Sequence, residues 1–134
     1  MNTKTKQSIN VGVDTGKFQL DIYIRPLDIC FTVSNDEKGI KEAIKLIKKH
    51  QPKRIVIEAT GRLEMPFIIA CANAHLPFVI ANPVDIKRFV GAIGQRAKTD
   101  KLDAHLIAHY GEAIKPKLST LKPDHHAVYE RLSR

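Results

Sequence analysis

The first third of the chain is dominated by an alternation of apolar and polar residues, and this feature most restricts its fold. Every second residue between residues 18 and 24 is Phe, Leu or Ile, which is the period-two pattern of a strand with one buried face. An apolar run at residues 9–14 precedes it, and the alternation returns at residues 29–33 after a turn at residues 26–28. The pattern predicts three consecutive antiparallel strands.

After residue 34 the periodicity becomes helical and is interrupted by short apolar runs. Apolar residues recur at helical spacing over residues 40–49, with Asn35 as the expected N-cap. The runs at residues 54–59 and 77–81 have the length and apolar character of buried parallel strands. Further helices are expected at residues 63–74, at residues 85–93 after Asn82 and Pro83, and from a cap at Thr99 or Asp100 to about residue 111. This order predicts an α/β, RNase H-like fold, in which a mixed five-stranded sheet of three antiparallel strands followed by parallel strands is flanked by helices.

Length and composition indicate one globular domain. The chain has 134 residues, of which 43% are hydrophobic and 27% charged, and this balance argues against a largely disordered chain. We expect the domain to occupy residues 1–112, and residues 113–134 to be a linker and the start of a helical region, so that the chain is a fragment of a longer protein. No apolar run reaches the roughly 18 to 20 residues that span a bilayer, and the polar start lacks a signal-peptide core, which predicts a cytoplasmic protein.

The charge balance points to a polyanionic partner. Lys and Arg number 22 against 14 Asp and Glu, a formal net charge of +8, so nucleic acid is the first partner to consider. Phosphate contacts from basic side chains position nucleic acid without reading its sequence. Taken singly, each basic residue is better explained as a solvated surface charge. As a group, the candidates for nucleic-acid binding are Lys17, Lys87, Arg88, Arg96, Lys98 and Lys101.

Four acidic residues occupy positions that an RNase H-like fold would bring together. Asp14 ends the first predicted strand, and Glu58 lies near the end of the fourth, which neighbours the first in such a sheet. Asp100 and Asp103 are three residues apart and would share one helical face. Mg²⁺ prefers hard oxygen ligands such as carboxylates, and two such ions can activate the nucleophile and stabilise the leaving oxygen in phosphoryl transfer. The four residues therefore predict a metal site for this chemistry.

Each acidic residue also has a structural explanation. Asp14 precedes Gly16, as a turn residue would. Asp100 and Asp103 suit the positive end of a helix, where acidic residues are common. Glu58 is harder to explain in this way, because a glutamate within an apolar strand needs a partner.

The cysteines and histidines offer no alternative metal site. Cys30 and Cys71 lie in apolar surroundings without zinc-ligand spacing, and we expect both to be reduced core residues. His105 and His109 are four residues apart but belong to no HExxH motif. We expect His105 to lie at the surface near the acidic helix.

Several short motifs, in this order, resemble the amino-terminal domain of the DEDD transposases of insertion sequences. These motifs are VGVDTGK at residues 11–17, IEATG at residues 57–61, Asn-Pro at residues 82–83 and, most specifically, AKTDKLDA at residues 97–104. The family includes the Piv-type DNA invertase and the bridge-RNA-guided recombinases. The resemblance covers roughly residues 9–112.

The resemblance implies a RuvC-like domain in which Asp14, Glu58, Asp100 and Asp103 are catalytic and bind Mg²⁺, or Mn²⁺ in its place. It implies cleavage and rejoining of DNA by a serine nucleophile from a carboxyl-terminal domain that this chain lacks. A structured guide RNA is an implied further partner, and the full-length protein is implied to be a homodimer or homotetramer. Residues 1–134 are then expected to bind metal without catalysing strand exchange alone.

Other functions stay open on the residues alone. A standalone RNase H-like nuclease or Holliday-junction resolvase uses the same carboxylates with water as nucleophile. A non-catalytic nucleic-acid-binding module would make the acids incidental. The sugar-kinase and actin-like class also begins with a VGVDTG strand, but it has a glycine-rich phosphate turn and a much longer chain.

Overall fold

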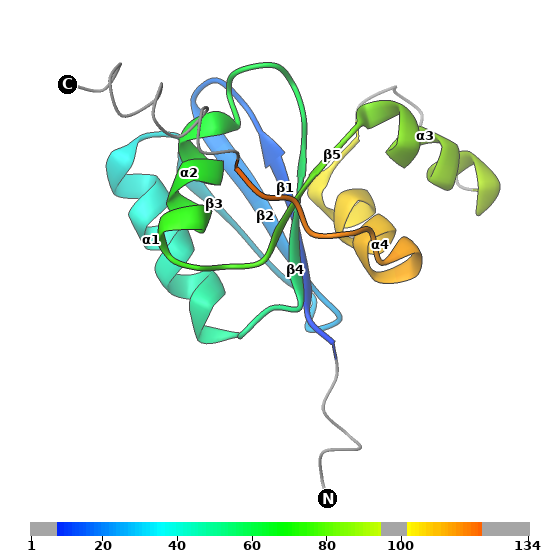
Figure 1. Ribbon diagram of the computed structural model, residues 1–134, viewed down its shortest axis with the longest axis horizontal. Coiled ribbons are helices and arrows are strands. Elements are labelled where there is room, and N and C mark those ends of the chain that lie inside the picture. Colours follow the sequence, from blue (N-terminus) through cyan, green and yellow to red (C-terminus); the bar gives the residue numbers. More distant parts are fainter. Residues whose placement is uncertain (1–7, 95–101, 122–134) are drawn as a thin grey trace, which may run out of the picture.

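The computed structural model describes residues 8–94 and 102–121, and its centre is one five-stranded sheet (Figure 1). β1, β2 and β3 are antiparallel neighbours, whereas β4 is parallel to β1 and β5 is parallel to β4. The order across the sheet is β3-β2-β1-β4-β5. This confirms the predicted α/β arrangement of an RNase H-like domain. The strand bounds are β1 (Asn10–Thr15), β2 (Gln19–Arg25), β3 (Ile29–Ser34), β4 (Arg54–Glu58) and β5 (Phe78–Ala81).

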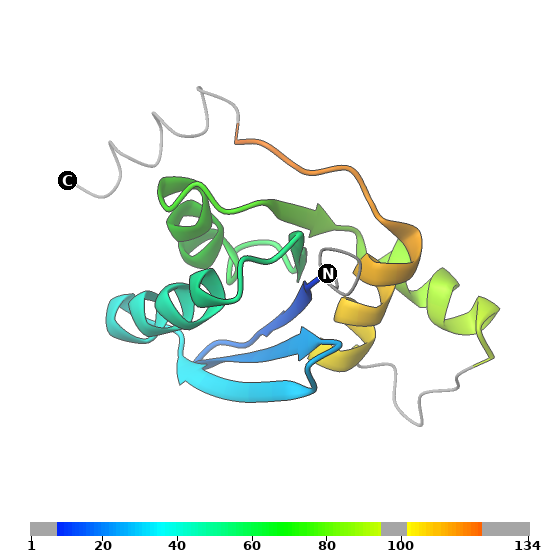
Figure 2. The same cartoon turned by 90° about the horizontal axis from the view of Figure 1, so that it is seen from below.

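Helices cover both faces of the sheet. α1 (Glu37–Lys49) and α2 (Met65–Asn73) lie on one face, while α4 (Ala104–Ile114) crosses the other beside α3 (Pro83–Ala92), as Figures 1 and 2 show. α3 begins where the sequence predicted, because the Asn82 side chain accepts a hydrogen bond from the Val84 N–H at 2.8 Å. Within the described ranges, no helix is both long enough and apolar enough to cross a membrane.

Alternation along the central strands divides the core into two layers. Val11 and Val13 of β1 pack with Ile55 and Ile57 of β4 in the cluster that α1 and α2 cover. Val56, which points the other way, packs with residues of β5, α3 and α4. Both faces of β4 are therefore buried, which explains why this strand is a continuous apolar run in the sequence.

α4 lies against β1 because one residue of that strand has no side chain. A Cβ atom added to Gly12 would overlap the carbonyl oxygen of Ala104 and would lie 2.5 Å from the backbone nitrogen of Ala108. The first turns of α4 therefore run directly over Gly12. This contact aims the amino terminus of α4 toward the carboxyl end of β1.

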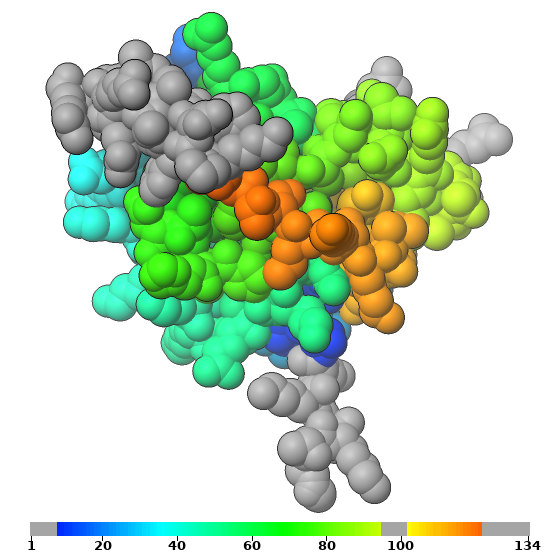
Figure 3. Space-filling model, in the orientation of Figure 1, coloured from blue at the N-terminus to red at the C-terminus, as the bar shows by residue number. Residues whose placement is uncertain are grey.

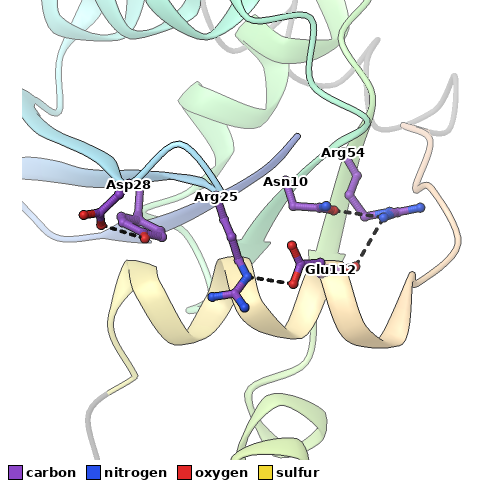
Figure 4. Close-up of polar contacts among 7 residues, drawn as sticks. Asn10, Arg25, Asp28, Arg54 and Glu112 are labelled. Atoms are coloured by element: carbon purple, nitrogen blue, oxygen red, sulfur yellow. Dashed lines mark hydrogen bonds and ion pairs between the residues drawn. The ribbon is translucent and has the colours of Figure 1, made fainter. Parts of the chain in front are cut away.

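Two arginines from the sheet hold the other end of α4 (Figure 4). The buried Arg54 side chain donates from Nη1 to Asn10 Oδ1 at 2.9 Å and to the Gly111 carbonyl oxygen at 3.2 Å. Arg25 forms an ion pair with Glu112, with 2.8 Å between Nε and Oε1. The helix is thus fixed near both of its ends.

The segment after α4 covers the β5 edge of the sheet. Lys115 ends the helix in a left-handed conformation, with a φ of 53°. The Ser119 N–H then donates to the Phe78 carbonyl oxygen at 2.8 Å, and Ser119 Oγ accepts from the Ile80 N–H at 2.9 Å. In Figure 3, this segment lies on the surface between the parts of the chain that form α2 and α4.

Two predicted helix starts were wrong. Asp36, not Asn35, caps α1, with its side chain accepting a hydrogen bond from the Gly39 N–H at 2.8 Å. Asn35 instead bridges the β1–β2 turn and the loop after β4, through hydrogen bonds to the carbonyl oxygens of Gly16 and Leu63. Asp103, rather than Thr99 or Asp100, caps α4. Asp103 therefore precedes the helix, and Thr99 and Asp100 lie outside the described residues.

The prediction of two core cysteines holds for one of them. Cys71 of α2 is fully buried, and burial raises the pKa of its thiol. Cys30 is exposed because β3 is an edge strand and Cys30 points away from the α1 and α2 layer. Both thiols are free.

Candidate metal and nucleic-acid site

Asp14 and Glu58 lie side by side at the carboxyl ends of two parallel strands. The last pair of residues in the β1–β4 register is Val13 and Ile57. Asp14 and Glu58 are the next residues on their strands. Both side chains share the sheet face of Gly12, which is the face that α4 covers. Since neighbouring strands are about 4.8 Å apart, the sheet brings these two predicted site residues together.

The electrostatics of Glu58 reflect this crowding. Glu58 is half-buried, and burial raises its pKa, with a further increase from the Asp14 charge and a smaller one from Glu64. Lys87 of α3 acts in the opposite direction. Burial and like charges both disfavour the carboxylate, and together they outweigh the opposite effect of Lys87 on the pKa of Glu58.

Asp103 lies at the start of α4 on the β2 side of these two acids. It is exposed, and its Oδ1 accepts a hydrogen bond from the Leu106 N–H at 2.9 Å. It lines a pocket together with Asp21 of β2. Asp21 pairs directly with Asp14 across the β1–β2 hairpin, so Asp14, Asp21 and Asp103 follow one another along this face.

The donor chemistry of the site fits a hard divalent cation. Asp14 and Glu58 offer carboxylate oxygens from rigid, adjacent strands, and their mutual repulsion would be relieved by a shared positive charge. Among the residues that the structure describes, no three His, Cys, Asp or Glu side chains are close enough to hold a metal ion. Asp100, the remaining predicted ligand, lies outside those residues.

Sequence reasoning missed two acidic residues near the site. Glu64 is buried, and it accepts hydrogen bonds from Thr60 Oγ1 at 2.6 Å and from the Gly61 N–H at 3.3 Å, which ties down the loop after β4. The alternation of the second strand marks Asp21 only as a polar position. Counting back across the β1–β2 turn would have placed Asp21 opposite Asp14.

The basic candidates that the structure describes flank the acids. Lys17 lies on the β1–β2 turn, and Lys87 and Arg88 lie on the exposed side of α3. Lys87 is close enough to Glu58 to affect its pKa. Arg96, Lys98 and Lys101 were predicted with them and lie outside the described residues.

The two histidines of α4 contact aromatic rings. His105 is exposed and stacks on Tyr23, with 3.9 Å between the ring centroids, as expected for a surface position near the acids. His109 meets the edge of Phe89 with 5.0 Å between ring centroids. The spacing of the two residues is therefore explained by packing.

Comparison with known proteins shows the family of this chain. A family model described as a transposase, that of the IS110-type DEDD transposases, matches residues 11–133. The chain belongs to this transposase family. Two pilin gene-inverting proteins, from Moraxella bovis and Moraxella lacunata, are each 31% identical to it over 118 residues. The alignments cover 78% of this chain but only 37% of each relative, so the chain spans little more than a third of their length.

These matches confirm the transposase and Piv-type relationship that the sequence motifs predicted. The matched range of the transposase domain begins three residues before Asp14 and contains Glu58, Asp100 and Asp103. The roles of these four residues stay predictions. The structure adds that Asp14 and Glu58 share one corner of the fold with the amino terminus of α4.

Proposed function

We propose that this chain is the amino-terminal catalytic domain of a DNA transposase or site-specific recombinase. It would bind Mg²⁺, or Mn²⁺, through Asp14, Glu58, Asp100 and Asp103, for cleavage and rejoining of DNA strands. The observation that carries this proposal is the placement of Asp14 and Glu58 on adjacent parallel strands, where the Asp14 charge contributes to the raised pKa of Glu58.

Different residues of the chain would bind the metal and the phosphate groups. Asp14 and Glu58 provide ligands fixed by the sheet, while Asp103 is held by the cap of α4. The metal, when bound, supplies positive charge for the scissile phosphate and lowers the barrier to its attack. Lys17, Lys87 and Arg88 flank these acids and would bind neighbouring phosphates.

The nucleophile would come from elsewhere in the full-length protein. We propose a serine in a carboxyl-terminal domain, so that residues 1–134 bind metal but catalyse no strand exchange alone. The family membership and the greater length of the relatives support this division. In the same full-length protein we propose a structured guide RNA, assembly into dimers or tetramers, and action in the cytoplasm.

Calorimetric titration with Mn²⁺ tests the metal site. Wild type should bind Mn²⁺, and Asp14→Asn or Glu58→Gln should weaken binding at least about tenfold, the scale on which loss of one strong ligand acts. Glu42→Gln is a matched control, because Glu42 is exposed on α1, on the opposite face of the sheet. Equal binding by all four proteins would overturn the proposal. DNA cleavage by wild-type residues 1–134 would instead indicate a standalone nuclease.

A further inference from the structure

We propose that Phe18 stacks on an unpaired base of the nucleic acid that the acidic site acts on. The inference rests on the proposed function, because it takes nucleic acid as the ligand of this edge of the sheet. Phe18 is 78% exposed, while the next most exposed large apolar side chains of the described residues, Val84 and Ile114, are each 51% exposed. A phenylalanine this exposed contributes little to the core, so a ligand is the better explanation of its position.

The location of Phe18 connects it to the site. It lies on the turn between β1 and β2, four residues after Asp14, at the carboxyl end of β1. The turn is closed by a hydrogen bond from the Gly16 N–H to the Gln19 carbonyl oxygen at 2.8 Å. Phe18 therefore lies at the same end of the sheet as Asp14 and Glu58, and we infer that a nucleic-acid strand with its phosphate at these acids also reaches the Phe18 ring.

Asn35 holds this turn in place. Its N–H donates to the Phe18 carbonyl oxygen at 2.9 Å, and its Nδ2 donates to the carbonyl oxygens of Gly16 at 2.8 Å and Leu63 at 3.3 Å. The β1–β2 turn and the loop after β4 are thus joined through one side chain. Because the backbone under Phe18 is fixed in this way, binding a base would require little further ordering of the protein.

The surroundings of the ring favour nucleic acid over protein. Lys17 places its Nζ 5.4 Å from the Phe18 ring centroid, a cation–π geometry. Aromatic rings beside basic groups are the usual platform for single-stranded nucleic acid, because the ring stacks on a base while the cation meets the backbone. The net charge of +8 favours the same partner.

The absence of tryptophan from the chain gives a direct test. Phe18→Trp introduces one fluorescent ring at the proposed position. Ile114→Trp introduces a matched ring at the carboxyl end of α4, which lies at the opposite end of the strands. Each variant is titrated with single-stranded DNA, with the same strand carrying abasic positions, and with blunt duplex. Binding is followed separately by fluorescence anisotropy of the labelled DNA.

We expect single-stranded DNA to quench the tryptophan at position 18, with much weaker quenching by the abasic strand and by duplex. The tryptophan at position 114 should not respond. Phe18→Ala should weaken binding of the normal strand about 5- to 100-fold, as loss of one base–aromatic stack does, while its affinity for the abasic strand changes little. Lys17→Gln should weaken binding of both strands alike.

Two results would overturn the inference and distinguish it from the proposed function. DNA binding without quenching at position 18, and with unchanged affinity of Phe18→Ala, would show that Phe18 does not stack on a base while leaving the catalytic proposal intact. Absence of both DNA binding and Mn²⁺ binding would overturn both proposals.

Discussion

Asp14 and Glu58 each stand one residue beyond the Val13–Ile57 pair of two parallel strands, and the Asp14 charge is one cause of the raised pKa of Glu58. The sheet therefore holds two like charges next to each other. A fold selected only for stability would avoid this arrangement, because replacing one carboxylate by a neutral group relieves the repulsion. The repulsion between Asp14 and Glu58 should therefore lower the stability of the metal-free protein.

Glu58→Gln should increase the free energy of unfolding of the metal-free protein at neutral pH by a few tenths to about 1 kcal/mol, the scale of partly screened charge interactions. Because the pKa of Glu58 is raised in the folded state, the folded protein holds this proton more tightly than the unfolded chain. The stability of the wild type relative to Glu58→Gln therefore falls as pH rises from the unfolded value of about 4.3 through the raised pKa. Urea unfolding over this range measures the difference, and identical profiles would contradict the prediction.

Asp103 combines a capping role with a proposed metal role, and two substitutions separate them. Asp103→Ala removes the hydrogen bond to the Leu106 N–H and should destabilise the protein by about 0.5–2 kcal/mol, as loss of an N-cap does. Asp103→Asn keeps a capping side chain, so its melting temperature should stay near that of wild type while its Mn²⁺ affinity falls. Thermal melts and calorimetry test the pair. Unchanged Mn²⁺ affinity of the Asn variant would leave Asp103 as a cap only.

The sequence was sufficient for the sheet and for half of the acidic site. The antiparallel strands follow from local periodicity and turn positions, and the element order of an RNase H-like fold places Asp14 and Glu58 at the ends of neighbouring strands. The choice between adjacent capping residues was not predictable in this way. Asn35 and Asp36 are both good N-caps, and the decision depends on Gly16 and Leu63, which Asn35 contacts instead.

The start of α4 was mispredicted for a similar reason. Asp100 and Asp103 both precede apolar residues at helical spacing, so local sequence permits either cap. The close contact of Ala104 and Ala108 with Gly12 fixes where α4 lies, and a contact between residues so far apart in the chain leaves no periodic signal. The exposure of Cys30 likewise depends on β3 being an edge strand.

Gly12→Ala should destabilise the protein by about 1–3 kcal/mol, the usual effect of overpacking. The added Cβ would overlap the Ala104 carbonyl oxygen and force α4 away from β1, which would also displace Asp103 and reduce Mn²⁺ affinity. Gly91→Ala is the matched control, because Gly91 lies in α3 with no atom within 4 Å of an added Cβ. That control should be neutral or stabilising by up to about 1 kcal/mol. Similar losses in both variants would show that the Gly12 contact is unimportant.

The two arginines that hold the carboxyl end of α4 should contribute unequally. Arg54→Met keeps an apolar stem but removes the donor to the buried Asn10 Oδ1, whereas the Gly111 carbonyl oxygen keeps its hydrogen bond from the Lys115 N–H. One buried acceptor without a partner makes a loss of about 1–3 kcal/mol the expected result. Arg25→Gln breaks an ion pair whose side chains are 31% and 36% exposed, so it should cost at most about 1 kcal/mol. Urea unfolding of both variants measures the two losses in the free energy of unfolding. Equal losses would mean that the Arg25–Glu112 pair fixes α4 as strongly as the buried Arg54 contacts do.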